Sequence, residues 1–493
     1  MMCERVAGPS QGPAVESLHR ARLALMGLGE DGTRVGPGMF DPDVVSFAHG
    51  EGVRRPFPGA IRNAIEALRD ADGAPIENYM FLRRFPDLET EIAHSFCRVG
   101  VPRAFARNVV LDAGSTRLMV AAIGLMTRGG SDVVTSPGFY HPLAGWCGYL
   151  DRPLHVLPTS RARAYKLGAK ELRDWIARTR PKVPPLLVLF NPTMTGAVYS
   201  QDELDDLGAV LVEADMLAIE DALFAGSEYD ADGARGRLAA SPAGERCLTV
   251  AGASKLHCLA NLRIGWGCGP DWLVAILQDY ITSSAASIPH VAKAAALGAL
   301  RAPALFSRRN VEECRRRIGL VCELVHGLDA RLRAATRLNA PMVTVGHPVE
   351  AGHSVLLEFP CLVGHELPEG GTLGDGADLT RLFLNEAKVA FAPAVSHGFE
   401  GPRVRANVAS IGTDLTYGAS RLWEDRADEA WGEEQEHSFD DGFAQARELI
   451  VSAFAERVEP ALLKLLNQLP DVTRPMPQRQ SAAAIAAGQG AAL

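Results

Sequence analysis

A lysine at position 255 stands where a lysine is difficult to accommodate. It follows a β-rich apolar run and the small residues at 251–254, and the chain after it is again apolar. An arginine, Arg263, comes eight positions later. Because a buried lysine is costly unless it is paired or chemically committed, this pattern predicts a reactive amine with a second cation nearby.

Two further groups that could do chemistry follow other strand-like runs. Asp221 comes directly after the apolar run at 217–220, and a buried carboxylate must meet a cation or hydrogen-bond donors. Gly114, Ser115 and Thr116 follow a third run and open a helical stretch, where N–H groups and hydroxyls can bind an anion. A hydroxyl at a helix start is more often a plain N-cap, so this feature counts only together with the others.

One cofactor would use all of these groups. Pyridoxal 5'-phosphate combines a phosphate ester, a protonatable ring nitrogen and an aldehyde. An anion site at 114–116 suits the phosphate, Asp221 suits the ring nitrogen, and Lys255 can form a Schiff base with the aldehyde. The sequence therefore predicts a pyridoxal-phosphate site.

The elements that must position these groups alternate along the chain. Helical stretches such as 117–126 and 201–213 separate short apolar runs, which we expect to be strands, at 108–111, 132–135, 154–157, 186–190, 217–220 and 247–251. Such alternation predicts a mostly parallel sheet covered on both faces, with ligands at the carboxyl ends of its strands.

The pattern changes after about residue 302. A long Arg-rich helix is expected at 307–335, strands at 342–345, 355–359 and 405–409, and a final amphipathic helix at about 443–469. We therefore expect an N-terminal arm (1–44), a large cofactor-binding domain (45–305), a smaller α+β domain (306–470) joined by N-terminal residues, and a flexible tail (471–493).

With these residues in view, the chain resembles the class I/II aminotransferases of the fold-type-I pyridoxal-phosphate enzymes, over roughly residues 45–470. The strongest match is Ser254-Lys255 followed by Arg263-Ile264-Gly265. The resemblance implies a mostly parallel seven-stranded sheet in a three-layer large domain, plus a smaller α+β domain. It also implies a homodimer with shared active sites.

The resemblance also implies residue roles. Lys255 is the catalytic lysine. The implied cofactor-binding residues are Gly114, Ser115, Thr116, Phe139, Asn191, Asp221, Phe224, Ser254, Lys255 and Arg263, with Tyr79 reaching the phosphate of the neighbouring subunit. Phe139 is implied to stack on the ring. Arg405 is implied to clamp the substrate α-carboxylate, for which a guanidinium is suited, with Arg403 as a neighbouring rival. Gly50 is implied to lie near the substrate.

Three positions depart from the family pattern. Phe224 stands where the family usually has a tyrosine that donates a hydrogen bond to the cofactor's phenolic oxygen. The loop at 191–196 is stretched, and a glycine expected near Arg84 is missing. Losing a donor to a phenolate disfavours the charged form of that oxygen, which points to a specialised enzyme.

The expected reaction begins with Lys255 acting as a base at Cα of an amino acid. Transamination with a specialised biosynthetic substrate is the first expectation. The alternative is a lyase, cyclase or γ-elimination/replacement enzyme resembling aminocyclopropane-carboxylate synthase, which would use S-adenosylmethionine. A pyridoxal-binding DNA regulator would need a helix-turn-helix, and the first 45 residues are too short and too rich in glycine and proline for one.

Net charge, cysteine content and the length of the apolar runs limit the possible partners and the location of the protein. The net charge of −9 comes mostly from residues 424–441, which hold nine acids and one arginine and read as a solvated loop or exposed helix. No basic stripe predicts nucleic acid as a partner. Nine dispersed cysteines without a CxxC motif predict free thiols and no metal site. No apolar run is long enough for a membrane span, and the N-terminus lacks a signal-like apolar region, so we expect a cytoplasmic protein.

Overall fold

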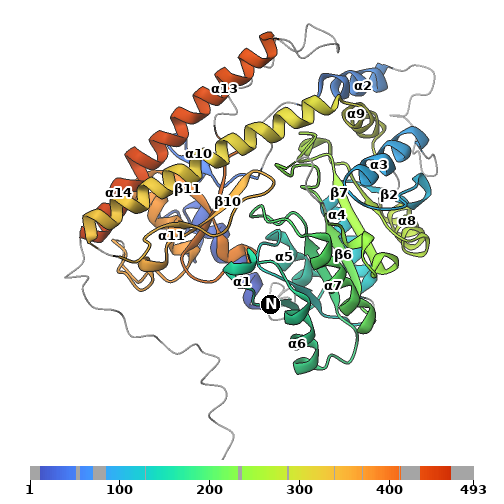
Figure 1. Cartoon of the computed structure of the whole chain (residues 1–493), viewed down its shortest axis with the longest axis horizontal. Coiled ribbons are helices and arrows are strands. Elements are labelled where there is room, and N and C mark those ends of the chain that lie inside the picture. Colours follow the sequence, from blue (N-terminus) through green and yellow to red (C-terminus); the bar gives the residue numbers. More distant parts are fainter. Residues whose placement is uncertain are drawn as a thin grey trace, which may run out of the picture.

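The computed structural model contains two sheets (Figure 1). It describes residues 12–50, 56–69, 85–127, 129–230, 236–285, 288–337, 339–368, 370–409, 411 and 433–467. The larger sheet has seven strands in the order β2-β8-β7-β6-β5-β3-β4, and the smaller has five in the order β1-β11-β12-β10-β9.

The seven-stranded sheet is parallel except for one strand. Its strands are β2 (Val109–Asp112), β3 (Val133–Thr135), β4 (Leu154–Val156), β5 (Leu186–Phe190), β6 (Leu217–Asp221), β7 (Cys247–Gly252) and β8 (Gly265–Cys268). β8 runs antiparallel between β2 and β7. The six predicted strands are confirmed to within one residue at each end. β8 was not predicted, because its sequence GWGC has two glycines among four residues and lacks a strand-like apolar run.

Helices cover both faces of this sheet. Alternate side chains of β5 enter two cores: Leu186, Val188 and Phe190 pack with α4 (Ser115–Met126) and α8 (Asp271–Ala285), and Leu187 and Leu189 pack with α6 (Ala169–Thr179) and α7 (Gln201–Glu213). A strand buried on both faces reads as a continuous apolar run, which is why LLVLF identified it. The three-layer architecture that the sequence predicts is therefore confirmed.

Further helices complete this part of the chain. They are α2 (Pro58–Arg69), α3 (Pro86–Arg98), α5 (Pro142–Tyr149) and α9 (His290–Leu300). α2, α3 and α9 share a core with the β2 and β8 edge of the sheet.

The five-stranded sheet is mainly antiparallel. Its strands are β1 (Val45–Phe47), β9 (Thr344–Val345), β10 (Ser354–Glu358), β11 (Val389–Pro393) and β12 (Arg403–Asn407), and only β1 pairs parallel, with β11. The sequence predicts β9, β10 and β12 with a shift of one or two residues at most ends and misses β1 and β11. Residues 45–47, which we expected in the large domain, thus belong to the smaller sheet.

Long helices run beside this sheet. α1 (Pro13–Met26) and α11 (Gly376–Leu382), followed by the π-helical turn Phe383–Ala387, lie together on its β11 side. α10 (Ala304–Thr336) crosses from the smaller sheet toward α2 and α9, with α13 (Glu433–Ser452) beside it (Figure 1). The π-helical turn Ala453–Val458 and α14 (Glu459–Asn467) end the described chain.

The final helix begins ten residues earlier than the sequence predicts, inside the acidic segment. Acidic residues are favourable near a helix N-terminus, and further along α13 Asp440 forms an ion pair with Arg316 of α10 at 2.8 Å. Residues 424–432 of that segment, and the tail at 471–493, lie outside the described residues.

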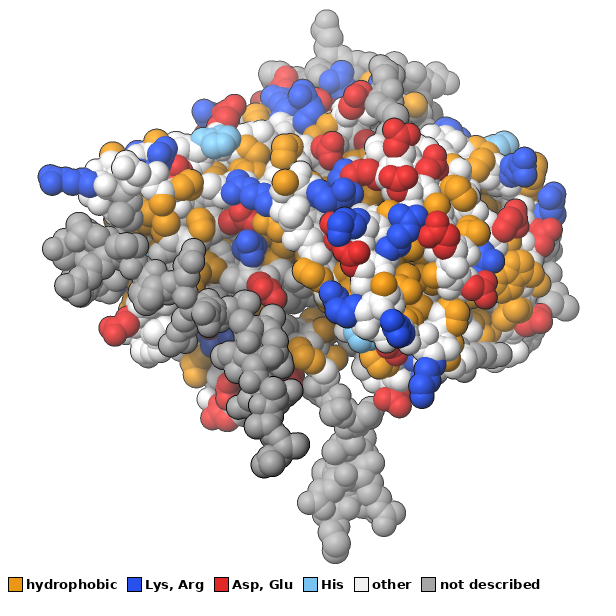
Figure 2. All heavy atoms as spheres, turned by 60° about the horizontal axis from the view of Figure 1, so that its bottom comes forward, with side chains coloured by type: hydrophobic (Ala, Val, Ile, Leu, Met, Phe, Trp, Pro, Cys, Tyr) orange, Lys and Arg blue, Asp and Glu red, His pale blue; other side chains and the backbone are white. Residues whose placement is uncertain are grey.

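The surface is mixed in charge. On the face shown in Figure 2, basic and acidic side chains are interspersed. None of the described helices combines the length and the apolar composition needed to cross a bilayer.

Candidate active site

Lys255 lies just beyond the end of β7, in a turn that faces the N-terminal chain. Its Nζ donates a hydrogen bond to the carbonyl oxygen of Gly50, three residues beyond β1. The smaller sheet therefore holds the backbone of Gly50 against the amine that β7 positions. Ser254, the preceding residue, is buried.

Asp221 is the last residue of the neighbouring strand β6, and its carboxylate is buried. Its Oδ1 accepts a hydrogen bond from the N–H of Leu223 at 3.0 Å. Burial raises the pKa of Asp221 to about 6, although the Leu223 N–H and the charge of Lys255 both oppose that rise. A carboxylate with a raised pKa gains from a cationic partner, which a protonated ring nitrogen would supply.

Gly114, Arg263 and the start of α4 form an anion cradle. Gly114 precedes α4 with φ +92°, and no described side chain caps the helix. A Cβ at Gly114 would lie 2.5 Å from Nη2 of Arg263, so glycine lets the guanidinium reach the helix start. A Cβ at Gly265 would lie 2.1 Å from the backbone nitrogen of Ser115, so β8 approaches equally closely. Thr116 lies in the same first turn. Backbone N–H groups and an arginine at a helix N-terminus suit a phosphate.

Arg405 is a buried cation at the centre of β12. Val404 and Ala406 on either side enter the core of the smaller domain, so strand alternation turns the guanidinium toward the site. Its Nη2 donates to the carbonyl oxygen of Ala48 at 3.4 Å, and no carboxylate among the described residues pairs with it. Burial lowers the pKa of Arg405 to about 10.

The neighbouring Arg403 serves a different purpose. Its Nε donates to Glu358 on β10 at 2.8 Å, so its charge is neutralised within the smaller sheet. Of the two arginines that the sequence offered for a substrate carboxylate, only Arg405 is free of an acidic partner among the described residues.

Tyr140, and not Phe139, faces these charges. Phe139 is 1% exposed and packs in the core under α4. The hydroxyl of Tyr140 lies close enough to Asp221, Arg405 and Arg263 for their charges to affect its pKa, which burial raises. The ring of Phe139, for which the sequence predicts a stacking role, lies in the core of the larger domain. Its neighbour Tyr140 is the aromatic side chain at the site.

Asn191, which the resemblance implies as a cofactor-binding residue, lies in a buried hydrogen-bond network. Its Nδ2 donates to Glu220 and to the carbonyl oxygen of Gly236, both at 2.9 Å, and its Oδ1 accepts from the N–H of Tyr199 at 3.2 Å. Both amide protons are therefore committed to a buried polar network on the far face of β6. They are not available to a cofactor.

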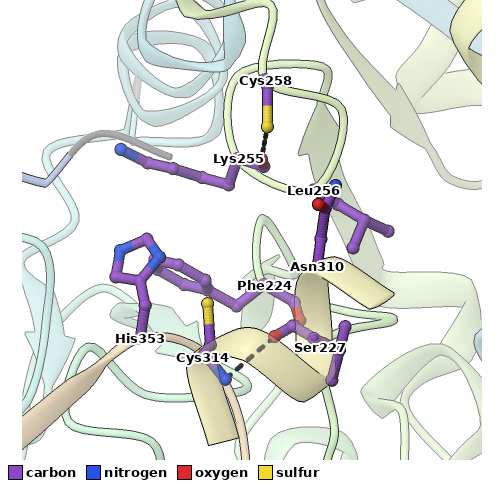
Figure 3. Close-up of a pocket in the computed structure, with 10 residues that line it drawn as sticks. Phe224, Ser227, Lys255, Leu256, Cys258, Asn310, Cys314 and His353 are labelled. Atoms are coloured by element: carbon purple, nitrogen blue, oxygen red, sulfur yellow. Dashed lines mark hydrogen bonds between the residues drawn. The ribbon is translucent and has the colours of Figure 1, made fainter. Parts of the chain in front are cut away.

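Beside Lys255 is a small cavity of about 40 Å³, which is partly open to solvent. Phe224 lines it, and the edge of its ring meets His353 with ring centroids 5.0 Å apart. Figure 3 shows the amine end of Lys255 and the imidazole of His353 on the same side of the cavity, with Asn310 on the other. Sequence reasoning missed His353 and Asn310, because His353 directly precedes β10 and Asn310 lies on α10, both remote in sequence from every strand-end motif.

The surroundings of the site are positively charged. Burial and the charges of Arg405 and Lys255 lower the pKa of His353 well below its usual value, and the pKa of His141 to about 3. Neutral histidines among cations suit a ligand that carries several negative charges. The described residues contain no group of three His, Cys, Asp or Glu side chains able to hold a metal ion. Tyr79 and Arg84 lie outside the described residues.

Comparison with known proteins agrees with this geometry. The sequence model of the family "Aminotransferase class I and II" matches residues 44–420. An aspartate aminotransferase of Streptomyces avermitilis is 24% identical over 394 residues, which cover 77% of this chain and 88% of the relative. An aspartate/prephenate aminotransferase of Cereibacter sphaeroides is 24% identical over 420 residues, which cover 84% of this chain and 95% of that relative.

Solved structures show the same fold. The aspartate aminotransferase of Rhizobium meliloti superposes with a TM-score of 0.67 at 18% identity, covering 92% of this chain and 98% of that one. The Thermus thermophilus aspartate aminotransferase with maleate superposes with a TM-score of 0.63 at 19% identity. The match covers 91% of this chain and 99% of that one. The family match spans most of the sequence, and the fold agrees with it. The chain belongs to the class I and II aminotransferases and is an enzyme of that family.

Proposed function

We propose that this protein is a pyridoxal-phosphate-dependent aminotransferase that acts at Cα of an amino acid and serves a specialised biosynthetic substrate. One observation carries the proposal: Lys255, Asp221, Arg405 and the cradle of Gly114 and Arg263 converge at the carboxyl ends of β6 and β7 and the start of α4. The low identity to named aspartate aminotransferases and the presence of Phe224 support a specialised substrate.

The residues present fit pyridoxal phosphate. The glycine at 114 leaves a cradle beside Arg263 that a Cβ would fill, and this cradle would hold the phosphate. Asp221 would face the ring nitrogen, Tyr140 would lie against the ring, and Lys255 would hold the aldehyde carbon. When bound, this cofactor supplies an electron sink for the pair of electrons released at Cα.

The chain's own groups would divide the remaining work. Arg405 would bind the α-carboxylate, since it is a buried guanidinium without an acidic partner among the described residues. This contact fixes the orientation of Cα relative to the amine of Lys255. In this structure the Lys255 amine is held by the Gly50 carbonyl. Once the substrate's amine has taken its place at the aldehyde carbon, the freed Lys255 amine would take a proton from Cα and deliver it to that former aldehyde carbon, not back to Cα. The buried walls around Asp221 exclude water and strengthen these charge interactions.

A homodimer with shared active sites is part of the proposal. Ile61, Ile65 and Leu68 form an exposed apolar stripe on α2, with 42%, 41% and 56% of their surface accessible. Such a stripe is typical of a helix covered by a partner subunit. The described cysteines are all free, which supports the proposed cytoplasmic location.

Absorption spectroscopy of the purified protein tests the proposal. We expect a visible cofactor band that disappears in Lys255→Ala and that changes when the correct amino acid is added, with a keto acid as the product detected by mass spectrometry. Absence of the band, or an unchanged band in Lys255→Ala, would overturn the cofactor assignment. Release of a leaving group such as methylthioadenosine without a keto acid would instead identify a lyase or replacement enzyme.

A further inference from the structure

Two buried polar side chains in the cavity beside Lys255 have no hydrogen-bond partner at one atom each. Within the described part of the chain, these atoms are Nε2 of His353 and Nδ2 of Asn310. His353 is 6% exposed and Asn310 is 9% exposed, so water does not easily satisfy them. A buried polar group without a partner is costly, and its presence beside a reactive amine points to a ligand.

The other polar groups of the cavity are already committed. The hydroxyl of Ser227 donates to the carbonyl oxygen of Phe224 at 2.5 Å and accepts from the N–H of Gly352 at 3.1 Å. The thiol of Cys258 donates to the carbonyl oxygen of Lys255 at 3.7 Å. His353 and Asn310 are therefore the side chains that offer a ligand new hydrogen bonds, and they lie on opposite sides of the cavity (Figure 3).

The charge of the cavity favours an uncharged ligand group. Among the described residues that line it, Lys255 is the only one with a formal charge, and the proposed function commits that amine to the cofactor and Cα. A carboxylate would enter without a cation of its own. An aliphatic group would leave both polar atoms unsatisfied.

We infer that this cavity receives the substrate's side chain and recognises an uncharged carboxamide through His353 and Asn310. The amide nitrogen of Asn310 is a donor and requires an acceptor, and a neutral imidazole can donate or accept at Nε2. A carboxamide carries both an oxygen acceptor and an N–H donor, so it offers a partner of the kind that each of the two atoms requires. The inference rests on the proposed function, because it takes Lys255 as the point where Cα is held.

Non-reacting analogues test the inference by binding alone. Succinamate, succinate and 4-methylpentanoate match asparagine, aspartate and leucine in shape but lack the amino group. Glutaramate, glutarate and 5-methylhexanoate do the same for a side chain one carbon longer. Isothermal titration calorimetry of the cofactor-loaded enzyme should give the amide the lowest Kd in at least one series, by about tenfold over both matched analogues.

Two near-isosteric variants test whether Asn310 and His353 cause the preference for the amide. Asn310→Leu and His353→Phe should each raise the Kd of the preferred amide by about tenfold and leave the Kd of its aliphatic analogue within about twofold. The aliphatic analogue thus serves as the internal control for folding. Equal binding of the three analogues, preference for the dicarboxylate, or an unchanged preference in both variants would overturn the inference.

Reactivity with amino acids separates this inference from the proposed function. If no amino acid changes the visible band of the loaded enzyme, the proposed function fails. If amino acids react and the analogues show no amide preference, only the inference fails.

Discussion

Replacing Arg405 should strengthen the fold and impair the reaction at the same time. Burial lowers the pKa of Arg405 to about 10, from a reference value of 12.5. At about 1.4 kcal/mol per pKa unit, holding the charge in the folded, ligand-free protein costs about 3 kcal/mol at neutral pH. Because the folded pKa lies below the unfolded one, this cost is fully present at pH 7. It declines only as the pH rises above about 10.

The variant Arg405→Met removes the charge and keeps an unbranched apolar side chain. Without ligand, its free energy of unfolding should rise by up to about 3 kcal/mol, which denaturant titration would measure. The kcat/KM for an amino acid should fall by about 30- to 4,000-fold, since losing one partner of a buried charge pair costs about 2–5 kcal/mol.

Arg403→Met is the matched control, two residues away on the same strand. Its guanidinium pairs with the buried Glu358 at 2.8 Å, so its loss should destabilise the fold and change kcat/KM only a few-fold. If Arg405→Met instead destabilised the protein and left kcat/KM intact, Arg405 would be a structural residue and the carboxylate assignment would be wrong.

Three other perturbations probe the remaining parts of the site. Burial raises the pKa of Asp221 to about 6, so the free energy of unfolding of the ligand-free protein should fall by about 3 kcal/mol as the pH rises from 4 to 6. Denaturant titrations at each pH should show that Asp221→Asn lacks this fall. Gly114→Ala should raise the cofactor Kd by about 10- to 100-fold in absorbance titrations, because a Cβ there meets Arg263 and φ is +92°. Gly130→Ala, with φ +83° and open space around the Cβ, is its control, and an equal effect in both would refute the contact. Phe224→Tyr should move the pH transition of the visible cofactor band about one unit lower by adding a donor, and identical titrations would refute that role.

The apolar runs along the chain were enough to predict six of the seven strands of the larger sheet. Strands buried on both faces must be apolar throughout, so runs such as 186–190 stand out from the amphipathic helices between them. Functional groups at the ends of those strands, such as Asp221 and Lys255, could then be assigned to one edge. β8 could not be predicted in this way, since Gly265 is there for close approach to Ser115 and not for strand propensity.

Positions that depend on tertiary contacts were harder to predict. Which of two adjacent aromatics faces the site is decided at Gly138, which has φ +87° and donates to the carbonyl oxygen of His397 in the other part of the chain. That contact turns Phe139 into the core and Tyr140 toward Asp221. The hydroxyl of tyrosine suits a site that binds polar ligands, and this difference from phenylalanine was the signal in the sequence that favoured Tyr140.

The place of Asn191 in a buried hydrogen-bond network had a signal in the sequence. Glu220 and Asp221 are consecutive in a strand, so their side chains point to opposite faces of the sheet. Only one of them can face the site, and the other needs donors inside the core. Asn191 supplies such a donor to Glu220, which is fully buried. Two adjacent acids at a strand end therefore predict a structural amide nearby as well as a functional carboxylate.

The groups that the free fold leaves unsatisfied around Lys255 argue for function more strongly than any single motif. Nε of Arg405, Nε2 of His353 and Nδ2 of Asn310 are all buried without partners in the described part of the chain. An unpaired buried polar group costs about 1–3 kcal/mol, which is a large share of the 5–15 kcal/mol by which a typical protein is stable. Elsewhere in this fold, buried charges such as Arg317 with Glu313, or Arg237 with Glu228, are paired at 2.7 and 2.8 Å. Single buried atoms without a hydrogen-bond partner also occur elsewhere in the described chain, for example Nε of Arg237 and Oγ1 of Thr249. What distinguishes His353, Asn310 and Arg405 is that they gather around one lysine: the first two line the cavity beside Lys255, and the charges of Lys255 and Arg405 both act on His353. This clustering around a reactive amine argues for a ligand that completes them.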